Sequence, residues 1–144
     1  MGPEIIPLTV SLTGDFSDSM NSLAYRYYQD PKIWAIYPKY GKKNGGTLIK
    51  VWGENFLNMD NHLRCEIGTK SVPAVFVDEH YVYCHTPPSD VVNSPMPFRV
   101  SLNGQQATEE ATQYWYYEFP SIYLLDPNRG VDSGGTHVLL KGKL

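Results

Sequence analysis

Apolar and polar side chains alternate along several short stretches of this chain. The alternation is clearest in 47–53, 62–68, 81–88 and 97–104. It places on a common side of each stretch the apolar residues Ile49, Val51, Leu63, Cys65, Ile67, Val82, Cys84, Phe98, Val100 and Leu102. A period of two residues is typical of a half-buried β-strand. Helical periodicity is hard to find anywhere, so the pattern predicts an all-β fold.

Three further stretches, 33–37, 71–77 and 112–119, complete the expected set of strands. Pro73 places the second of them at a sheet edge, because proline has no N–H to give to a ladder. Seven short strands with turn signals between them predict a two-sheet, immunoglobulin-like β-sandwich. The inward residues of the first and last strands are expected to be Ile33, Ile36, Tyr114 and Tyr116.

An internal repeat sets the organisation of the chain. The stretch 25–53 aligns without a gap with 114–142, an offset of 89 residues, and 7–14 aligns with 97–104 at an offset of 90. The first copy of the longer match contains the repeated residues Tyr25, Tyr27, Tyr28, Pro31, Ile33, Pro38, Gly41, Gly45, Gly46, Thr47 and Gly53. A unit of this length suits a small β-sandwich better than a helical solenoid repeat.

The repeat predicts three parts. Residues 32–119 form one whole repeat, 1–31 are the C-terminal strands of a preceding repeat, and 120–144 are the N-terminal strands of a following repeat. Neither partial repeat can bury a full core by itself. We therefore expect a piece of a longer tandem array. The alternative is that the end strands pair with each other or with a second molecule.

Composition narrows the classes of partner. Charged residues make up 19% of the chain and the formal net charge is -3, which does not favour nucleic acid or an anionic membrane. No apolar run approaches the ~20 residues that cross a bilayer. The first ten residues also lack the pattern of a secretion signal. We expect no nucleic-acid partner and no membrane contact by this segment.

The stretch "GKKNGGTLIKVWG" (41–53) resembles a phosphate-binding loop at first sight. Such a loop needs its lysine directly after a glycine and before the hydroxyl, whereas Lys42 and Lys43 precede the glycine pair. The second copy also replaces these lysines with Val131 and Asp132. The stretch is therefore predicted to be a strand-linking turn, because glycines supply φ > 0. The residues of this turn motif are Pro38, Gly41, Gly45, Gly46, Thr47 and Gly53.

The ordered set of motifs resembles the IPT/TIG family, the immunoglobulin-like modules of plexins and certain transcription factors. The resemblance rests on "IWAIYPKYGKKNGGTLIKVWGENF", "LRCEIG", "VYCHTPP", "FRVSLNG" and "YWYYEFPSI", after which the cycle restarts. It implies an early-set immunoglobulin-like sandwich without catalytic machinery or cofactors. It also implies either tandem extracellular arrays or single copies attached to DNA-binding domains, and the repeat favours the first.

Cys65 and Cys84 have two interpretations. Modules similar to this one in cell-surface proteins often contain a disulfide, and oxidation suits an exported protein. Alternatively, the two residues are buried free thiols that act as small apolar side chains. A metal site lacks support, because no CxxC spacing and no pair of nearby histidines is present.

No catalytic site can be assembled from the sequence. A Gly-x-Ser-x-Gly elbow is missing, and so is a DxDxDG calcium loop. We therefore expect no enzyme, no bound metal and no cofactor.

Trp52 and Trp115 are the candidate partner contacts. Both are expected to point outward from their strands, and their counterparts in the other copies are Lys141 and Arg26. A framework position would not tolerate such an exchange easily, and aromatic anchors concentrate interface energy. The alternative is that outward aromatics pack against an adjoining repeat.

The leading hypothesis is a non-catalytic structural or interaction module of an extracellular or cell-surface protein. Its partners would be adjoining IPT/TIG repeats of the same chain and an unknown protein. An intracellular cytoskeletal or ciliary scaffold with reduced cysteines is the main alternative. A DNA-binding accessory domain and an accessory module of a carbohydrate-active enzyme are weaker alternatives.

Overall fold

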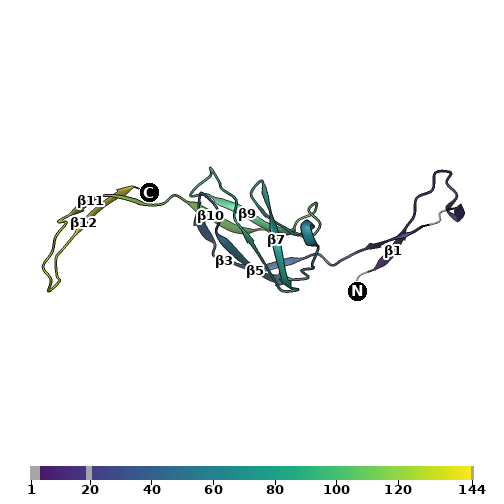
Figure 1. Ribbon diagram of the computed structural model, residues 1–144, viewed down its shortest axis with the longest axis horizontal. Coiled ribbons are helices and arrows are strands. Elements are labelled where there is room, and N and C mark those ends of the chain that lie inside the picture. The colour runs from purple at the N-terminus through teal and green to yellow at the C-terminus, as the bar shows by residue number, and fades with distance from the viewer. Residues whose placement is uncertain (1–3, 19–20, 144) are drawn as a thin grey trace.

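The computed structural model describes residues 4–18 and 21–143 and has a central sandwich with one β-hairpin at each end (Figure 1). The central sandwich contains β3 (Lys32–Tyr37), β4 (Tyr40–Lys42), β5 (Leu48–Glu54), β6 (Arg64–Ile67), β7 (Lys70–Asp78), β8 (Tyr81–His85), β9 (Pro95–Ser101) and β10 (Thr112–Tyr117). A short 3-10 helix, Asp60–His62, precedes β6. The all-β, immunoglobulin-like prediction is confirmed.

The strands of the central sandwich follow the order β3-β5-β8-β7-β6-β9-β10-β4. β7 connects the two sheets. Its first half, Lys70 to Pro73, pairs with β6, and its second half, from Ala74 onward, pairs with β8. The first sheet is therefore β3-β5-β8 with the end of β7, and the second is β6-β9-β10-β4 with its start. Pro73 lies on the half of β7 that forms the edge of the second sheet, as expected.

The prediction of seven strands and a simple turn at 41–46 was incomplete. Residues 40–42 form an extra short strand, β4, which pairs in parallel with β10. The Lys43 N–H continues this contact by donating to the Tyr117 carbonyl at 2.9 Å. β10 would otherwise leave main-chain groups unpaired on that side, and buried polar groups of this kind are costly. A cis peptide bond between Tyr37 and Pro38 lies between β3 and β4.

The core fills the space between the two sheets. The predicted inward residues are buried there, with Ile33 partly buried at its margin. The fully or nearly fully buried apolar residues are Ile36, Ile49, Val51, Phe56, Leu63, Cys65, Ile67, Ala74, Val82, Cys84, Phe98, Val100, Leu102, Tyr114 and Tyr116. Alternation along each strand thus places one apolar row against the other sheet.

The N-terminal hairpin consists of β1 (Ile5–Leu8) and β2 (Leu23–Arg26), and a 3-10 turn, Phe16–Asp18, lies between them. Its register pairs Leu8 with Leu23 and Ile5 with Arg26. In the repeat alignment this is the same register as that of β9 with β10, where Phe98 pairs with Thr112 and Pro95 with Trp115. The hairpin therefore has the geometry of the last two strands of the central sandwich.

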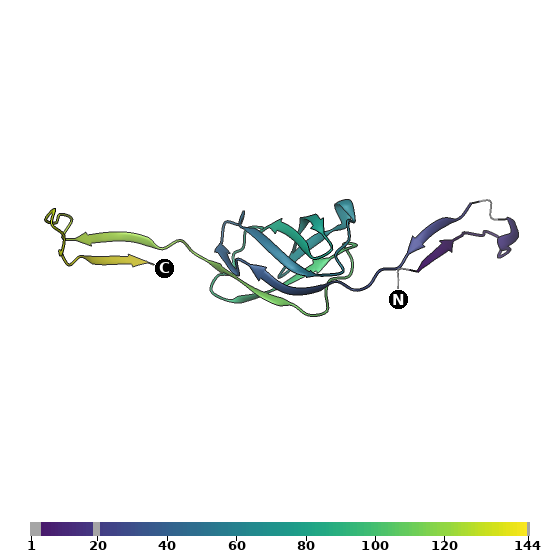
Figure 2. The same cartoon turned by 90° about the horizontal axis from the view of Figure 1, so that it is seen from below.

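The C-terminal hairpin consists of β11 (Ser121–Asp126) and β12 (Leu139–Lys143). Its register is that of β3 with β5, shifted by the repeat length. The register irregularity between Ile122 and Leu124 also matches the one between Ile33 and Ala35. The two hairpins extend from opposite ends of the central sandwich and give the molecule an elongated shape (Figure 2).

Candidate interaction surfaces

The Gly-Gly-Thr part of the turn motif is joined to the segment that follows β8. Gly45 and Gly46 both have φ of +77°, a conformation that favours glycine. The Gly46 N–H donates to the Thr86 carbonyl at 2.7 Å, and the Thr86 N–H donates to the Thr47 carbonyl at 2.9 Å. The Thr47 N–H also donates to Thr86 Oγ1 at 3.1 Å. The backbone donors of this turn are therefore used within the fold.

At two other positions of the motif, glycine is required because there is no room for a Cβ atom. A Cβ on Gly41 would lie 1.9 Å from the Tyr114 hydroxyl and 2.5 Å from Thr47 Oγ1. A Cβ on Gly53 would lie 1.9 Å from the Lys32 carbonyl oxygen. Positive φ therefore explains glycine at positions 45 and 46, whereas lack of space for a side chain explains it at positions 41 and 53.

Cys65 and Cys84 form a disulfide. Cys65 lies on β6 in the second sheet and Cys84 on β8 in the first, with 6.5 Å between their Cα atoms. Both residues are buried at the centre of the core. The bond therefore connects the two sheets, and the free-thiol alternative is not what the structure contains.

Two buried tyrosines of β10 differ in how their hydroxyls are satisfied. The Tyr116 hydroxyl donates to the Pro87 carbonyl at 2.8 Å, and burial raises its pKa to about 12. Burial also raises the pKa of the Tyr114 hydroxyl, although the nearby Thr47 and Thr86 hydroxyls act in the opposite direction. Among the described residues, no atom meets hydrogen-bond geometry with the Tyr114 hydroxyl. Both tyrosines are framework residues.

Trp52 lies on the outer face of the first sheet, as predicted, with 38% of its surface exposed. It stacks on Tyr81 of the adjacent strand, with ring centroids 5.7 Å apart and an interplanar angle of 28°. Tyr81 in turn lies 6.5 Å from Tyr83, which pairs with Val75 in register. Trp52, Tyr81, Tyr83 and Val75 form a continuous surface that we call the aromatic face.

The sequence prediction did not single out Tyr81 and Tyr83. The signal was nevertheless present, because Val82 and Cys84 alternate inward and leave both tyrosines outward. Trp34 is also exposed, at 61%, and lies 5.6 Å from the His80 ring. It falls within the register irregularity of β3, which alternation alone could not place.

Trp115 lies on the outer face of the second sheet and is partly buried. Its ring stacks on Tyr40 of β4, with centroids 6.4 Å apart. Tyr114 and Tyr116, the residues on either side of Trp115 in β10, face the core, so Trp115 faces outward. It therefore lies on the opposite side of the sandwich from Trp52. The two predicted contact residues are therefore not brought together into one surface.

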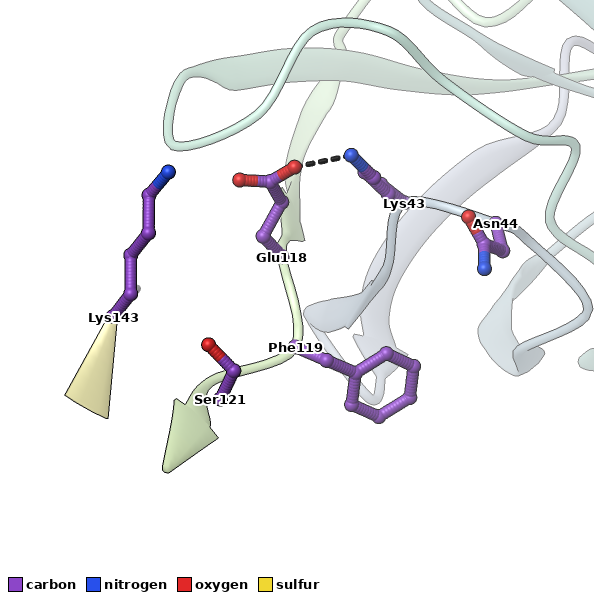
Figure 3. Close-up of a pocket in the computed structure, with 6 residues that line it drawn as sticks. All are labelled: Lys43, Asn44, Glu118, Phe119, Ser121 and Lys143. Carbon is purple, nitrogen blue, oxygen red and sulfur yellow. Dashed lines mark hydrogen bonds and ion pairs between the residues drawn. The ribbon is translucent and has the colours of Figure 1, made fainter. Parts of the chain in front are cut away.

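A pocket of about 300 Å³ lies where the central sandwich meets the C-terminal hairpin (Figure 3). It is lined by Lys43, Asn44, Glu118, Phe119, Ser121 and Lys143. The Lys43 ammonium forms an ion pair with the Glu118 carboxylate, and Lys143 lies on the other side of that carboxylate. The hydrogen bond from Lys43 holds the pKa of Glu118 below its usual value. Lys43 is thus engaged at this junction rather than in binding a phosphate.

Within 4–18 and 21–143, no three His, Cys, Asp or Glu side chains gather closely enough to hold a metal ion. In the same part of the chain, no helix has the length and apolar character needed to span a membrane.

The fold, the inter-sheet disulfide and the outward aromatics define an immunoglobulin-like β-sandwich module. The chain belongs to the IPT/TIG domain family, whose model matches residues 31–116. This confirms the resemblance found in the sequence.

Solved structures with a similar fold include the full extracellular region of plexin A4, domains 1 to 10. That structure is 21% identical, has a TM-score of 0.56, and is matched over 99% of this chain and 12% of its own length. A second plexin A4 structure, with domains 1 to 8, is 20% identical and has a TM-score of 0.54. The match covers 78% of this chain and 12% of the plexin chain. At these identities the similarity shows the fold alone. The chain spans about one eighth of the length of either plexin structure.

Proposed function

We propose that this chain is a non-catalytic protein-interaction segment of a multi-repeat extracellular or cell-surface protein. The observation that carries the proposal is the buried disulfide that connects the two sheets of an IPT/TIG sandwich. Disulfides form and persist in oxidising compartments and are rare in the cytosol. The similarity to an extracellular region of plexin A4 agrees with this location.

The division of the chain follows from the repeat. We assign 32–119 to a complete module, 1–31 to the last strands of a preceding module, and 120–144 to the first strands of a following one. The matching strand registers of both hairpins support this division. Residues 1–3, 19–20 and 144 of these segments lie outside the described residues.

The connections between these parts are short and held by side chains. On the C-terminal side, the Lys43–Glu118 ion pair lies beside the connection that ends at Pro120. On the N-terminal side, the Asn55 amide donates to the Asp30 carbonyl at 3.1 Å. Such joints fix the direction in which the central sandwich presents its outer faces.

The aromatic face is the surface that we assign to protein contact. Trp52 and its neighbours combine large apolar rings with polar tips, a composition that is enriched at binding hot spots. The position of Trp52 is occupied by Lys141 in the C-terminal hairpin, so the aromatic is not needed for the fold of a hairpin of this type. Trp115 and Tyr40 form a second, smaller candidate on the opposite side.

The test is a binding screen with the purified chain as bait. The probes are an array of purified extracellular proteins, a glycan array and a 30-base-pair DNA duplex. We expect specific hits on the protein array and at least tenfold weaker binding for Trp52→Ala, because hot-spot truncation typically costs 2 kcal/mol or more, on the order of a thirtyfold change in affinity. Trp115→Ala tests the second candidate in the same way.

The matched control is Tyr123→Ala, which removes an exposed aromatic side chain of the C-terminal hairpin. All three variants should melt within a few degrees of the parent chain, since surface substitutions usually change stability by less than about 0.5 kcal/mol. Binding to DNA or glycans alone, or equal loss in Tyr123→Ala, would contradict the assignment. Unfolding of Trp52→Ala would instead make it a framework residue.

A further inference from the structure

Two asparagines of the chain, Asn44 and Asn103, are each followed directly by glycine. At such a step, the main-chain nitrogen of the glycine can reach the side-chain amide carbon of the asparagine, because the glycine has no Cβ to obstruct the approach. At every other asparagine of the sequence, the next residue carries a side chain. The chain therefore has two positions at which an asparagine amide can be attacked by its own main chain.

The Asn103 side chain is fixed by hydrogen bonds. Its Oδ1 accepts from the Gln105 and Gln106 main-chain N–H groups, both at 2.9 Å, and its Nδ2 donates to the Gln106 side chain. The Ser101 hydroxyl also donates to the same Oδ1 at 3.5 Å. Attack by the Gly104 nitrogen requires the amide to turn toward that nitrogen, so these bonds must break first.

The Asn44 side chain is exposed and is held by no such network. Within the described part of the chain, its amide makes no hydrogen bond, ion pair or ring contact. One main-chain hydrogen bond, from the Gly45 N–H to the Lys42 carbonyl at 3.0 Å, closes the turn and must open before attack. The second copy closes the same turn with Ser133 at this position, so the turn does not depend on the amide.

We propose that Asn44 is a site of spontaneous deamidation and that the fold protects Asn103 from the same reaction. The Gly45 nitrogen gives its proton to water and bonds to the Asn44 amide carbon, and the side-chain nitrogen takes up a proton and leaves as ammonia. One water molecule then opens the cyclic imide. Cleavage of the new C–N bond leaves aspartate. Cleavage of the original peptide bond leaves isoaspartate, in which the main chain passes through the side chain.

Both products place a carboxylate in the pocket between the central sandwich and the C-terminal hairpin. Asn44 lines this pocket together with Lys43, Glu118 and Lys143 (Figure 3). Two carboxylates then share the two ammonium groups that one carboxylate had before. The new carboxylate competes with Glu118 for the Lys43 ammonium, whose hydrogen bond holds the pKa of Glu118 below its usual value. Deamidation therefore weakens the ion pair at this joint.

Isoaspartate changes the main chain as well as the charge. It inserts one methylene carbon before Gly45, and a Cβ on Gly45 would already lie 2.6 Å from the Thr86 carbonyl oxygen. The Gly46 N–H donates to this same oxygen at 2.7 Å. The turn has no room for a displaced residue 45, so isoaspartate should lower the melting temperature, as overpacking does.

Peptide mapping by mass spectrometry tests the proposal after incubation of the full chain for days to weeks at mildly alkaline pH. Trypsin separates the two positions into the peptides 44–50 and 100–129. Asn44 should convert to the acid at least tenfold faster than Asn103, because breaking one or two hydrogen bonds corresponds to about a tenfold change in rate. The acidic form of 44–50 should elute as two species of equal mass, aspartate and isoaspartate.

The same incubation in urea is the control for the fold. In the unfolded chain neither amide is held, so Asn44 and Asn103 should react at similar rates. Asn44→Ser introduces the residue of the second copy and should remove the acidic form of 44–50 without changing the rate at Asn103.

Asn44→Asp supplies the new charge without the altered main chain. The freshly purified variant should melt within a few degrees of the parent, whereas the isoaspartate fraction should melt lower. Its Glu118 carboxylate, followed by NMR, should titrate at a higher pKa than in the parent chain, and an unchanged pKa would remove the proposed effect on the ion pair.

Three results would overturn the proposed site: equal rates at the two asparagines in the folded chain, faster reaction at Asn103, or a difference that persists in urea. The last result would show that local sequence, rather than the fold, sets the rates. None of them bears on the proposed protein contact, because Trp52 lies on the outer face of the first sheet.

Discussion

At the scale of single residues, the turn motif is held together by one tight cluster. Gly41, Thr47 and Tyr114 meet so closely that residue 41 has no room for a side chain. The other copy has the same arrangement in milder form, because a Cβ on Gly130 would lie 2.8 Å from Thr136 Oγ1. The recurrence of glycine and threonine at these positions thus has a steric cause.

The cluster can be tested with a double-mutant cycle. Gly41→Ala should lower the free energy of unfolding by about 2 kcal/mol, the usual cost of overpacking a core. Tyr114→Phe alone should be close to neutral, because the hydroxyl it removes has no hydrogen-bond partner in the described structure. Together the two changes should recover part of the loss, since removing the hydroxyl makes room for the new Cβ.

Gly46→Ala is the control for this cycle. Its Cβ would meet no atom within 4 Å, but the φ of +77° makes alanine unfavourable by about 1 kcal/mol. Tyr114→Phe should not relieve this loss. Urea unfolding followed by circular dichroism measures all five variants, which are the three single variants and the two double variants that contain Tyr114→Phe. Purely additive effects of Gly41→Ala and Tyr114→Phe would contradict the steric explanation.

At the scale of elements, the alternation of apolar and polar residues predicted which side chains face the core. It did not predict the extra strand β4 or the passage of β7 from one sheet to the other. Period-two patterns in β5, β6, β8 and β9 determine which side chains are buried, because one residue of slip would expose the whole apolar row. β4 escaped prediction because three residues are too few for a period to be visible. The exchange of β7 between sheets at Pro73 depends on the tertiary arrangement of β6 and β8 and has no local signal. The outward aromatics could be placed on faces, but which rings stack depends on cross-strand register.

The disulfide is the element-scale contact whose loss is most readily measured. Replacing both cysteines, Cys65→Ala with Cys84→Ala, should destabilise the chain by about 3 kcal/mol, the chain-entropy contribution of a 19-residue separation. The parent protein, unfolded without reductant, should show no free thiol on titration. Two free thiols in protein purified from an oxidising compartment, or a stability change below about 0.5 kcal/mol, would contradict the structural role.

At the scale of the whole molecule, stability is expected to be unevenly distributed. Among the described residues, the central sandwich contains the whole buried apolar core, whereas each hairpin has two strands and an uncovered face. A two-stranded hairpin by itself is marginally stable in water. Local opening should therefore begin at the ends of the molecule.

Limited trypsin digestion of the full chain in dilute solution tests this expectation. Arg26 and Arg129 lie in exposed hairpin segments, so cleavage there should precede cleavage at Lys50 or Lys70 within the sandwich. Mass spectrometry should identify a resistant product of residues 27–129 whose melting temperature is close to that of the parent. Early cleavage at Lys50 or Lys70 would instead place the weakest region inside the sandwich.

The parallel pairing of β4 with β10 has a mechanical consequence. The chain enters the sandwich through β3 and β4 and leaves it through β10, so a pull on the two ends draws these neighbouring strands in opposite directions along their length. The hydrogen bonds that join 39–43 to 115–117 are then loaded together rather than one after another. Once this contact breaks, the disulfide still prevents residues 65–84 from extending. At ~3.4 Å per residue, the separation of 19 residues would span about 65 Å, but the two Cα atoms stay 6.5 Å apart, so the fully stretched chain is shorter by roughly 58 Å. A segment built in this way resists tension first and limits its own extension afterwards.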